Sequence, residues 1–162
     1  MDSLPPLPGQ LPWPVPDPRA RYFVADYAQM HDLVADLVPP AHAPAYITSV
    51  FETARELVRH SYYRYEFTTI AVSVSLFALE RAFSEHLGVK KPFQKMVEQA
   101  ANEGIITAEL AGRLAAGRNL RNKLAHGDLT DTALTPALAV AMVKAAFDSA
   151  ELLFPAPTDG PL

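Results

Sequence analysis

The sequence predicts an all-α fold, a compact multi-helix bundle preceded by a Pro-rich tail. Apolar residues recur at steps of three and four from about residue 19 to about residue 155, as on the buried faces of helices. Glycines and prolines stand at the ends of these periodic segments, and there is neither an Asn-Gly hairpin turn nor a sustained strand-like alternation. We therefore expect one helical domain at residues 19–155, a disordered tail at 1–18 and a flexible C-terminus at 156–162.

The tail holds seven of the 15 prolines in the chain and its one tryptophan, Trp13. Proline lacks a backbone N–H group and blocks helix formation, so a segment this rich in proline is expected to be extended or disordered. Two interpretations of Trp13 stay open. It either belongs to a freely moving tail, or it docks on a partner or on the bundle itself.

The first two helices are punctuated by proline. Asp17 is a suitable N-cap for a helix with Pro18 at its first position, and this helix is expected to continue until Pro39. A second helix is expected from Pro44 to about His60. These two segments carry apolar residues on one face, which predicts that each is half-buried.

A kink or short break is expected at residues 59–65, where polar and aromatic residues cluster. We expect the tyrosines of this cluster to pack in the core, with stacking on nucleic-acid bases as the alternative. They are Tyr62, Tyr63 and Tyr65. The third helix is expected at about 65–87 and to end at Gly88. It is apolar around most of its circumference, which predicts a central position in the bundle.

Three further helices complete the predicted bundle. A short one should begin at Pro92 and end at Gly104, and the next should run from a Thr107 cap to about residue 125. The last should start at Pro136 and reach about residue 154. This last helix has apolar residues in many directions. It is therefore either fully buried within the chain or packed against a second copy.

Composition narrows the function. The chain has no cysteine, so disulfides and thiolate metal sites are excluded, and its net charge of −4 argues against a broad nucleic-acid-coating surface. There is no signal-peptide pattern, and the longest apolar stretch, 70–79, is too short to span a bilayer. We expect a soluble, cytoplasmic protein with no membrane partner. The densest run of basic residues contains Arg113, Arg118, Arg121 and Lys123.

Most enzyme signatures are missing from the sequence. The five histidines stand at 31, 42, 60, 86 and 126, and no two have the four-residue spacing of a helical zinc pair. Glycine-rich phosphate loops and the GxSxG nucleophile turn are also absent. We therefore expect neither a metal nor a cofactor.

One segment stands out, and it lies near the end of the penultimate predicted helix. The run Arg121-Asn122-Lys123-Leu124-Ala125-His126-Gly127 resembles the motif of HEPN domains, in which an Arg, often followed by Asn, precedes a His by four to six residues. The resemblance covers about residues 44–154. It implies a compact helical bundle with one long helix after the motif.

The spacing Arg-x4-His occurs three times in the chain, and three features single out the last. An Asn follows the Arg, a Gly follows the His, and the segment precedes the terminal helix. The three pairs are Arg55 with His60, Arg81 with His86, and Arg121 with His126. Five residues on a helix turn the side chain by about 140°, so Arg121 and His126 converge only if the helix ends there, which Gly127 permits.

For HEPN ribonucleases the resemblance implies metal-independent cleavage of RNA by its own 2′-hydroxyl. Arg121 would bind the phosphate, His126 would transfer protons, and Asn122 would support either. A homodimer would bring two such motifs together. Arg113, Arg118 and Lys123 would line the RNA path. The activity would be that of a toxin or defence effector, with an antitoxin or another protein as a further partner.

Glu80 lies on the most apolar helix and corresponds to the inward Glu that this family often carries. A buried carboxylate needs a partner, so we predict a contact between Glu80 and Arg121 or Arg118. The alternative function is a non-catalytic HEPN-like module for interaction or nucleotide binding, in which Arg121 merely pairs with Glu80 or Asp128. A weaker third alternative is a regulator of a nucleotidyltransferase.

Overall fold

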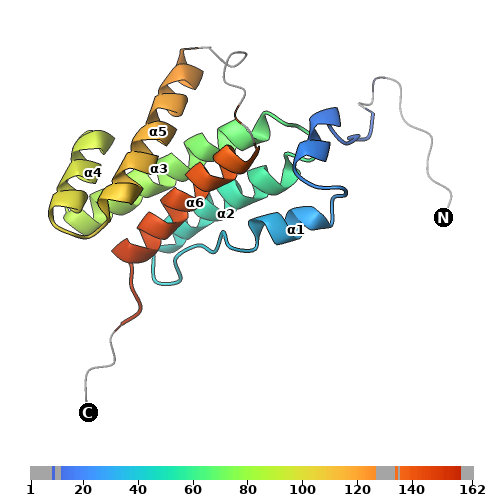
Figure 1. Ribbon diagram of the computed structural model, residues 1–162. Helices are drawn as coiled ribbons and strands as arrows, with labels where there is room; N and C mark the ends of the chain where they lie inside the picture. Colours follow the sequence, from blue (N-terminus) through green and yellow to red (C-terminus); the bar gives the residue numbers. More distant parts are fainter. Residues whose placement is uncertain (1–8, 10–11, 127–133, 135, 158–162) are drawn as a thin grey trace.

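The computed structural model describes residues 9, 12–126, 134 and 136–157. Within these residues every regular element is a helix, so the all-α prediction is confirmed. The elements are a 3-10 helix η1 (Pro18–Tyr22) and the α-helices α1 (Gln29–Val34), α2 (Ala45–His60), α3 (Phe67–Leu87), α4 (Phe93–Asn102), α5 (Ala108–Ala125) and α6 (Pro136–Leu153). Figure 1 shows them as a bundle with α4 and α5 at one end.

Helix α3 is the central element, as its apolar circumference predicts. It packs against α2, α4, α5 and α6 (Figure 1). Its buried side chains, such as Leu76, Leu79 and Phe83, point toward different neighbours in one continuous core. Burying a side chain of this size contributes about 1.5–3 kcal/mol each, so α3 supplies much of the apolar stabilisation of the bundle.

By length and composition alone, α3 is the one described helix that could cross a membrane. Its 21 residues exceed the stretch of 70–79 that the sequence argument considered. Within the bundle, 56% of its most apolar window is buried by other parts of the chain. That is the surrounding of a core helix, and the helix is weak evidence for a membrane span.

Local sequence signals set the helix ends. Gly88 and Gly104 end their helices with φ of 63° and 71°, a left-handed conformation that costs side-chain-bearing residues energy. Pro44 and Pro92 precede the first residues of α2 and α4. Thr107 begins α5, where its Oγ1 accepts a hydrogen bond from the Leu110 N–H at 3.1 Å. These boundaries confirm the predicted ones.

The prediction of one continuous first helix is wrong. The start at Asp17-Pro18 is confirmed, but η1 ends at Tyr22 and a separate helix, α1, begins at Gln29. The Oδ1 of Asp26 accepts the Gln29 N–H, and the Oε1 of Gln29 accepts the Ala25 N–H. This reciprocal pair resembles a capping box and starts a new helix in the middle of the apolar pattern.

The N-terminal segment is fastened to the turn between α2 and α3. The Asp17 N–H donates to the Tyr62 carbonyl at 2.8 Å, and the Asp17 carboxylate accepts the Tyr65 N–H at 3.2 Å. Asp17 and Pro18 therefore belong to the ordered body rather than to the tail. Trp13 is 91% exposed and is not docked on the bundle. Residues 1–8, 10 and 11 of the predicted tail, and 158–162 of the predicted C-terminal segment, lie outside the described residues.

The turn itself confirms the predicted break, and its tyrosines pack against other aromatic rings at the edge of the bundle rather than in its core. Tyr62 and Tyr63 each stack against Tyr27, with ring centroids 5.5 and 5.2 Å apart. The Tyr65 hydroxyl donates to the Leu134 carbonyl, and its ring lies 5.7 Å from Phe23. All three tyrosines are partly buried, so the cluster joins η1, α1 and α2 at this end of the bundle.

Most of the apolar surface of α6 is buried within the chain. Val143, Phe147 and Ala150 are fully covered, and the Phe147 ring packs on Phe51 at 4.8 Å. The small residues Ala145 and Ser149 are also buried, whereas Ala137 and Ala141 are exposed. The apolar exposure that remains on α6 is mainly at its two ends, where Leu138 is 46% and Leu152 45% exposed. Of the two alternatives for this helix, intrachain packing accounts for most of its apolar residues.

Candidate functional site at the end of α5

A close contact between helices places α5 on α3. Gly117 faces Leu76 and Val72, and a methyl group added at Gly117 would meet the Leu76 Cδ1 at 3.4 Å. The missing side chain lets the two backbones approach each other. Beyond this contact α5 rises away from α3 toward its C-terminal end (Figure 1). The predicted motif therefore occupies a protruding helix end.

Arg121 is held against α3 and α4. Its Nη1 donates to the Glu80 Oε2 at 3.2 Å, which confirms the predicted contact between Glu80 and an arginine. The predicted burial of the Glu80 carboxylate is wrong, because its side chain is 38% exposed. Its guanidinium carbon lies 5.4 Å from the centroid of the Phe77 ring and 5.6 Å from that of Phe93. The side chain is 19% exposed. Aromatic faces and a carboxylate thus fix the direction of a permanently charged group.

His126 follows the last residue of α5, and its side chain is exposed. Its backbone N–H donates to the carbonyls of Asn122 and Lys123 at 3.2 and 3.1 Å. Among the described residues, its ring has no hydrogen-bond partner. Gly127, the predicted end of the helix, lies outside the described residues, as does Asp128.

The other predicted site residues differ in their positions. Asn122 and Lys123 are exposed on the last turn of α5, beside the motif. Arg118 lies three residues before Arg121, and its Nη1 donates to the Gln94 Oε1 at 2.5 Å. Arg113 lies about two helical turns before Arg121, and its guanidinium pairs with Glu109 at 2.6 Å. The structure therefore brings Arg118 to the neighbourhood of Arg121 and leaves Arg113 apart.

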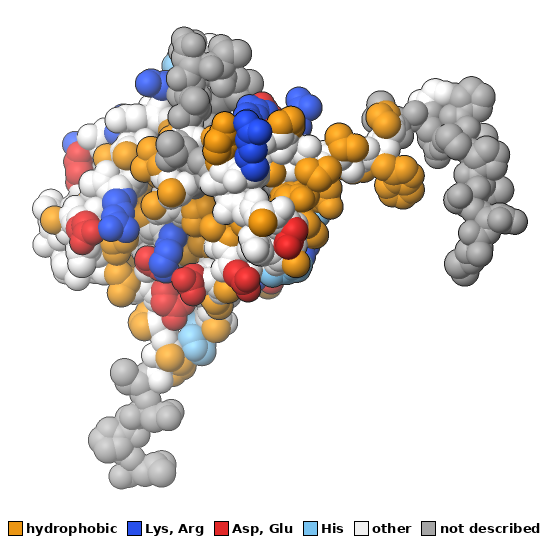
Figure 2. All heavy atoms as spheres, turned by 45° about the vertical axis from the view of Figure 1, so that its right-hand side comes forward, with side chains coloured by type: hydrophobic (Ala, Val, Ile, Leu, Met, Phe, Trp, Pro, Cys, Tyr) orange, Lys and Arg blue, Asp and Glu red, His pale blue; other side chains and the backbone are white. Residues whose placement is uncertain are grey.

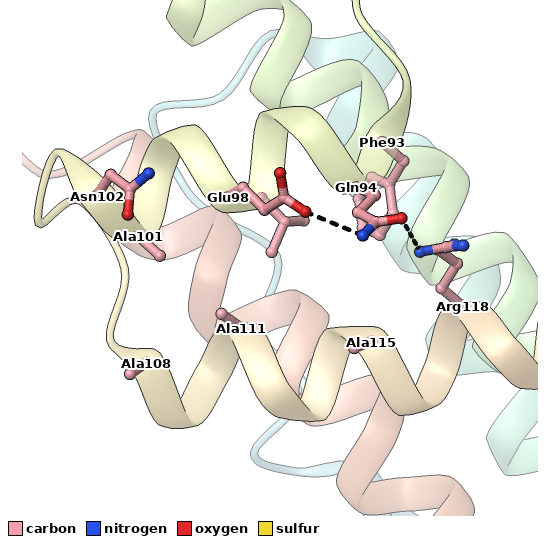
Figure 3. Close-up of a pocket in the computed structure, with 10 residues that line it drawn as sticks. Phe93, Gln94, Glu98, Ala101, Asn102, Ala108, Ala111, Ala115 and Arg118 are labelled. Atoms are coloured by element: carbon pink, nitrogen blue, oxygen red, sulfur yellow. Dashed lines mark hydrogen bonds between the residues drawn. The ribbon is translucent and has the colours of Figure 1, made fainter.

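A pocket of about 430 Å³ lies next to this site, between α4 and α5 (Figure 3). Phe93 lines it and also contacts Arg121, so the pocket and the motif share a wall. This pocket was not predicted from the sequence. Phe93, Gln94 and Glu98 were therefore not predicted as site residues, and neither was Phe77. One signal was present, since polar residues at 94, 98 and 102 and alanines at 108, 111 and 115 each repeat on a helical face.

Charges on the described surface are mixed. In the face of Figure 2, basic, acidic and apolar side chains alternate over the coloured residues without a continuous basic band. At the pocket rim, hydrogen bonds from Lys95 and Gln94 lower the pKa of the Glu98 carboxyl below its ordinary value. No group of three or more metal-ligating side chains is present among the described residues. The positive charge near the motif is therefore confined to a few side chains and is not part of a continuous basic surface.

No family model, curated protein or solved structure matches this chain. The HEPN resemblance therefore stays a prediction that rests on residues 121–127 and on the order of the helices. The structure adds that the motif stands at the end of α5, the penultimate helix, and that the 18 residues of α6 follow it. The structure itself establishes that the described part of the chain is an all-helical bundle.

Proposed function

We propose that this protein is a metal-independent endoribonuclease of the toxin or defence type, with Arg121 and His126 as its catalytic residues. One observation carries the proposal. Glu80 holds Arg121 at 3.2 Å, while His126, little more than one helical turn farther along, is exposed. An oriented phosphate-binding cation and an accessible imidazole are the two groups that this cleavage requires.

The reaction needs no group from outside the protein and the RNA. The 2′-oxygen attacks the neighbouring phosphorus, the bond from phosphorus to the 5′-oxygen breaks, and the products are a 2′,3′-cyclic phosphate and a 5′-hydroxyl. One imidazole removes the 2′-hydroxyl proton and another protonates the leaving 5′-oxygen. Because each chain offers one His126, a homodimer would supply the second imidazole.

Arg121 would stabilise the charge that develops on the phosphorane oxygens. A guanidinium carries several N–H donors in a planar fork, and in Arg121 one hydrogen bond is directed at Glu80. The remaining donors have no hydrogen-bond partner among the described residues, so in this scheme they contact phosphate oxygens. Glu80, which does not reach the phosphate in this scheme, positions the guanidinium. Arg118, Asn122 and Lys123 lie close enough along α5 to contact the RNA backbone.

A second candidate is a non-catalytic module for interaction or nucleotide binding. The observation that favours it is the burial of Arg121, which is 19% exposed and already paired with a carboxylate. In that case Arg121 would join α5 to α3, and His126 would be an ordinary surface residue. The two candidates differ in what removal of His126 changes.

The deciding experiment is RNA cleavage in EDTA by the wild-type protein and by His126→Ala. His42→Ala is the matched control, because His42 is also exposed and lies before α2, outside the motif. We expect a 2′,3′-cyclic phosphate product from the wild type and the control, and none from His126→Ala. Absence of cleavage by all three proteins across varied RNAs would favour the non-catalytic module. Equal cleavage by all three would assign the activity to a contaminant or another site.

A further inference from the structure

The pocket between α4 and α5 has two chemically different walls (Figure 3). Gln94, Glu98 and Asn102 repeat at four-residue steps on α4 and line one side. Opposite them, α5 presents Ala108, Ala111 and Ala115. Methyl side chains leave a shallow apolar surface, so the pocket combines a row of hydrogen-bonding groups with a wall suited to a flat ring.

The polar wall is linked to a cation at one end. The Gln94 Nε2 donates to the Glu98 Oε1 at 2.9 Å, and the Gln94 Oε1 accepts from the Arg118 Nη1 at 2.5 Å (Figure 3). This chain fixes the orientation of the Gln94 amide. An amide with a fixed orientation presents a defined pattern of donor and acceptor to a ligand edge.

Arg118 differs from Arg113, another arginine of the same helix. Arg113 forms an ion pair with Glu109 at 2.6 Å, whereas the partner of Arg118 is the neutral amide of Gln94. Among the described residues, Arg118 has no carboxylate within ion-pairing distance. Its guanidinium lies at the pocket wall, near the Glu98 carboxylate but not paired with it, so it can still donate to a ligand that carries a negative group.

The pocket also lies beside the proposed catalytic site, with Phe93 between them. Arg118 and Arg121 are three residues apart on α5 and so are neighbours on its surface. The Phe93 ring lines the pocket and lies 5.6 Å from the Arg121 guanidinium. A nucleotide with its base in the pocket would therefore direct its phosphate toward Arg118 and then toward Arg121.

We propose that the α4–α5 pocket binds one base of the RNA substrate, with Arg118 contacting the phosphate of that nucleotide. The assignment to a substrate rests on the proposed ribonuclease function, but binding of the nucleotide does not. A base has an apolar face for the alanine wall and hydrogen-bonding edges for Gln94 and Glu98. A purely aliphatic ligand would form no hydrogen bond with these groups.

The carboxylate of Glu98 sets the expected preference. It accepts hydrogen bonds and donates none, so it favours an edge with adjacent N–H groups. The N1–H and N2–H groups of guanine form such an edge. We therefore expect guanosine monophosphate to bind more tightly than adenosine, cytidine or uridine monophosphate.

The test is calorimetric titration of the full chain with the four nucleoside 5′-monophosphates and with guanosine. Ala111→Phe fills the pocket, and Ala116→Phe is its matched control, because Ala116 is exposed on the same helix but does not line the pocket. We expect Ala111→Phe to weaken guanosine monophosphate binding at least tenfold and Ala116→Phe to leave it unchanged. Arg118→Gln should weaken binding of the monophosphate severalfold and that of guanosine much less. Circular dichroism verifies that each variant is folded.

Two outcomes would overturn the inference: no binding of any monophosphate to the wild type at millimolar concentration, or equal binding by wild type and Ala111→Phe. The proposed function fails separately. Nucleotide binding that is lost in Ala111→Phe, together with no RNA cleavage by the wild type, would retain the pocket and remove the ribonuclease. Cleavage by the wild type without mononucleotide binding would retain the ribonuclease and remove the pocket.

Discussion

Two arginines at different ends of the bundle, Arg19 and Arg121, have similar surroundings. Each lies near an aromatic ring, Arg19 at 4.3 Å from the Tyr65 centroid and Arg121 at 5.4 Å from that of Phe77. Each also pairs with a carboxylate. They differ in how many of their donors are used. Arg19 donates from two side-chain nitrogens to Asp17 and also to Glu66, whereas among the described residues Arg121 donates to Glu80 alone.

The comparison shows that the exposure of an arginine does not indicate how many anions it binds. The Arg19 side chain is 45% exposed and that of Arg121 only 19%, yet Arg19 is the one whose hydrogen bonds are directed at two anions. These bonds raise the pKa of Arg19 and lower those of Asp17 and Glu66. We interpret the Arg19 cluster as a structural fastening of the N-terminal segment, and Arg121 as a group with donors in reserve.

The strongest test of this contrast replaces each arginine by alanine. Arg121→Ala is expected to lower kcat/KM for RNA cleavage by about 1000-fold, because it removes the charge that stabilises the transition state. Arg19→Ala is expected to cleave like the wild type and to melt at a lower temperature. Steady-state cleavage assays and thermal melts distinguish the two effects. An equal loss of activity in both variants would contradict the functional difference between the arginines.

The next effect concerns stability at the fastened end. Asp17→Ala removes the helix cap, the bond to the Tyr65 N–H and the anion of Arg19, and it should cost about 2 kcal/mol in the free energy of unfolding at pH 7. Hydrogen bonds from the Arg19 side chain hold the Asp17 pKa below its ordinary value. The folded-state pKa therefore lies below the unfolded one. The contribution of the charge is complete above about pH 4 and is lost as the pH falls through the lowered pKa.

Urea denaturation of wild type and Asp17→Ala between pH 7 and pH 2 measures this dependence. The difference between the two proteins should stay constant down to about pH 4 and narrow below it. A difference that grows toward acid pH would contradict the assigned direction of the pKa shift.

A smaller effect is expected at Glu80, the positioning partner of Arg121. Glu80→Gln keeps the shape and removes the charge, and it should lower kcat about tenfold with little change in KM, because Arg121 loses its orientation in the transition state. Glu85→Gln is the control on the same helix, since Glu85 pairs with the exposed Arg81 at 2.9 Å. A rise in KM with unchanged kcat would assign Glu80 to substrate binding instead.

The smallest effect concerns the stability of α5 at its two glycines. Gly112 lies inside this helix with no heavy atom near its missing side chain, so Gly112→Ala should stabilise the fold by about 0.5–1 kcal/mol. In Gly117→Ala the new methyl group contacts Leu76 at 3.4 Å, so its gain should be smaller. Thermal melts of the two variants test this order. Destabilisation by Gly112→Ala would indicate a contact that this surface does not show.

Much of the fold could be predicted because its boundaries are local. Pro44, Gly88, Pro92 and Gly104 act through their own backbone geometry, and the sequence contains that information directly. The interruption after Tyr22 was missed because the apolar period continues through it. The Asp26 and Gln29 side chains that restart the helix form an Asp-x-x-Gln pattern, which was present in the sequence and was overlooked.

The candidate site likewise has one feature that was predicted from the sequence and one that was not. The contact between Glu80 and Arg121 was predicted from the apolar character of the helix that carries Glu80, although the Glu80 side chain is only partly buried. The α4–α5 pocket could not be predicted, because the repeats of polar residues on α4 and of alanines on α5 do not show that these two faces oppose each other in space. Taken alone, Gln94 and Ala111 are ordinary surface residues of their own helices. They form opposite walls of a pocket only after the bundle has formed.

The position of Trp13 has a practical consequence for work on this protein. It is the one tryptophan in the chain, it is 91% exposed, and it precedes the anchoring residue Asp17 by four positions. Its emission is therefore already that of an indole in water and should change little when the bundle unfolds. Tryptophan fluorescence will report instead on whatever covers the start of the chain, so it serves as a built-in sensor of association there.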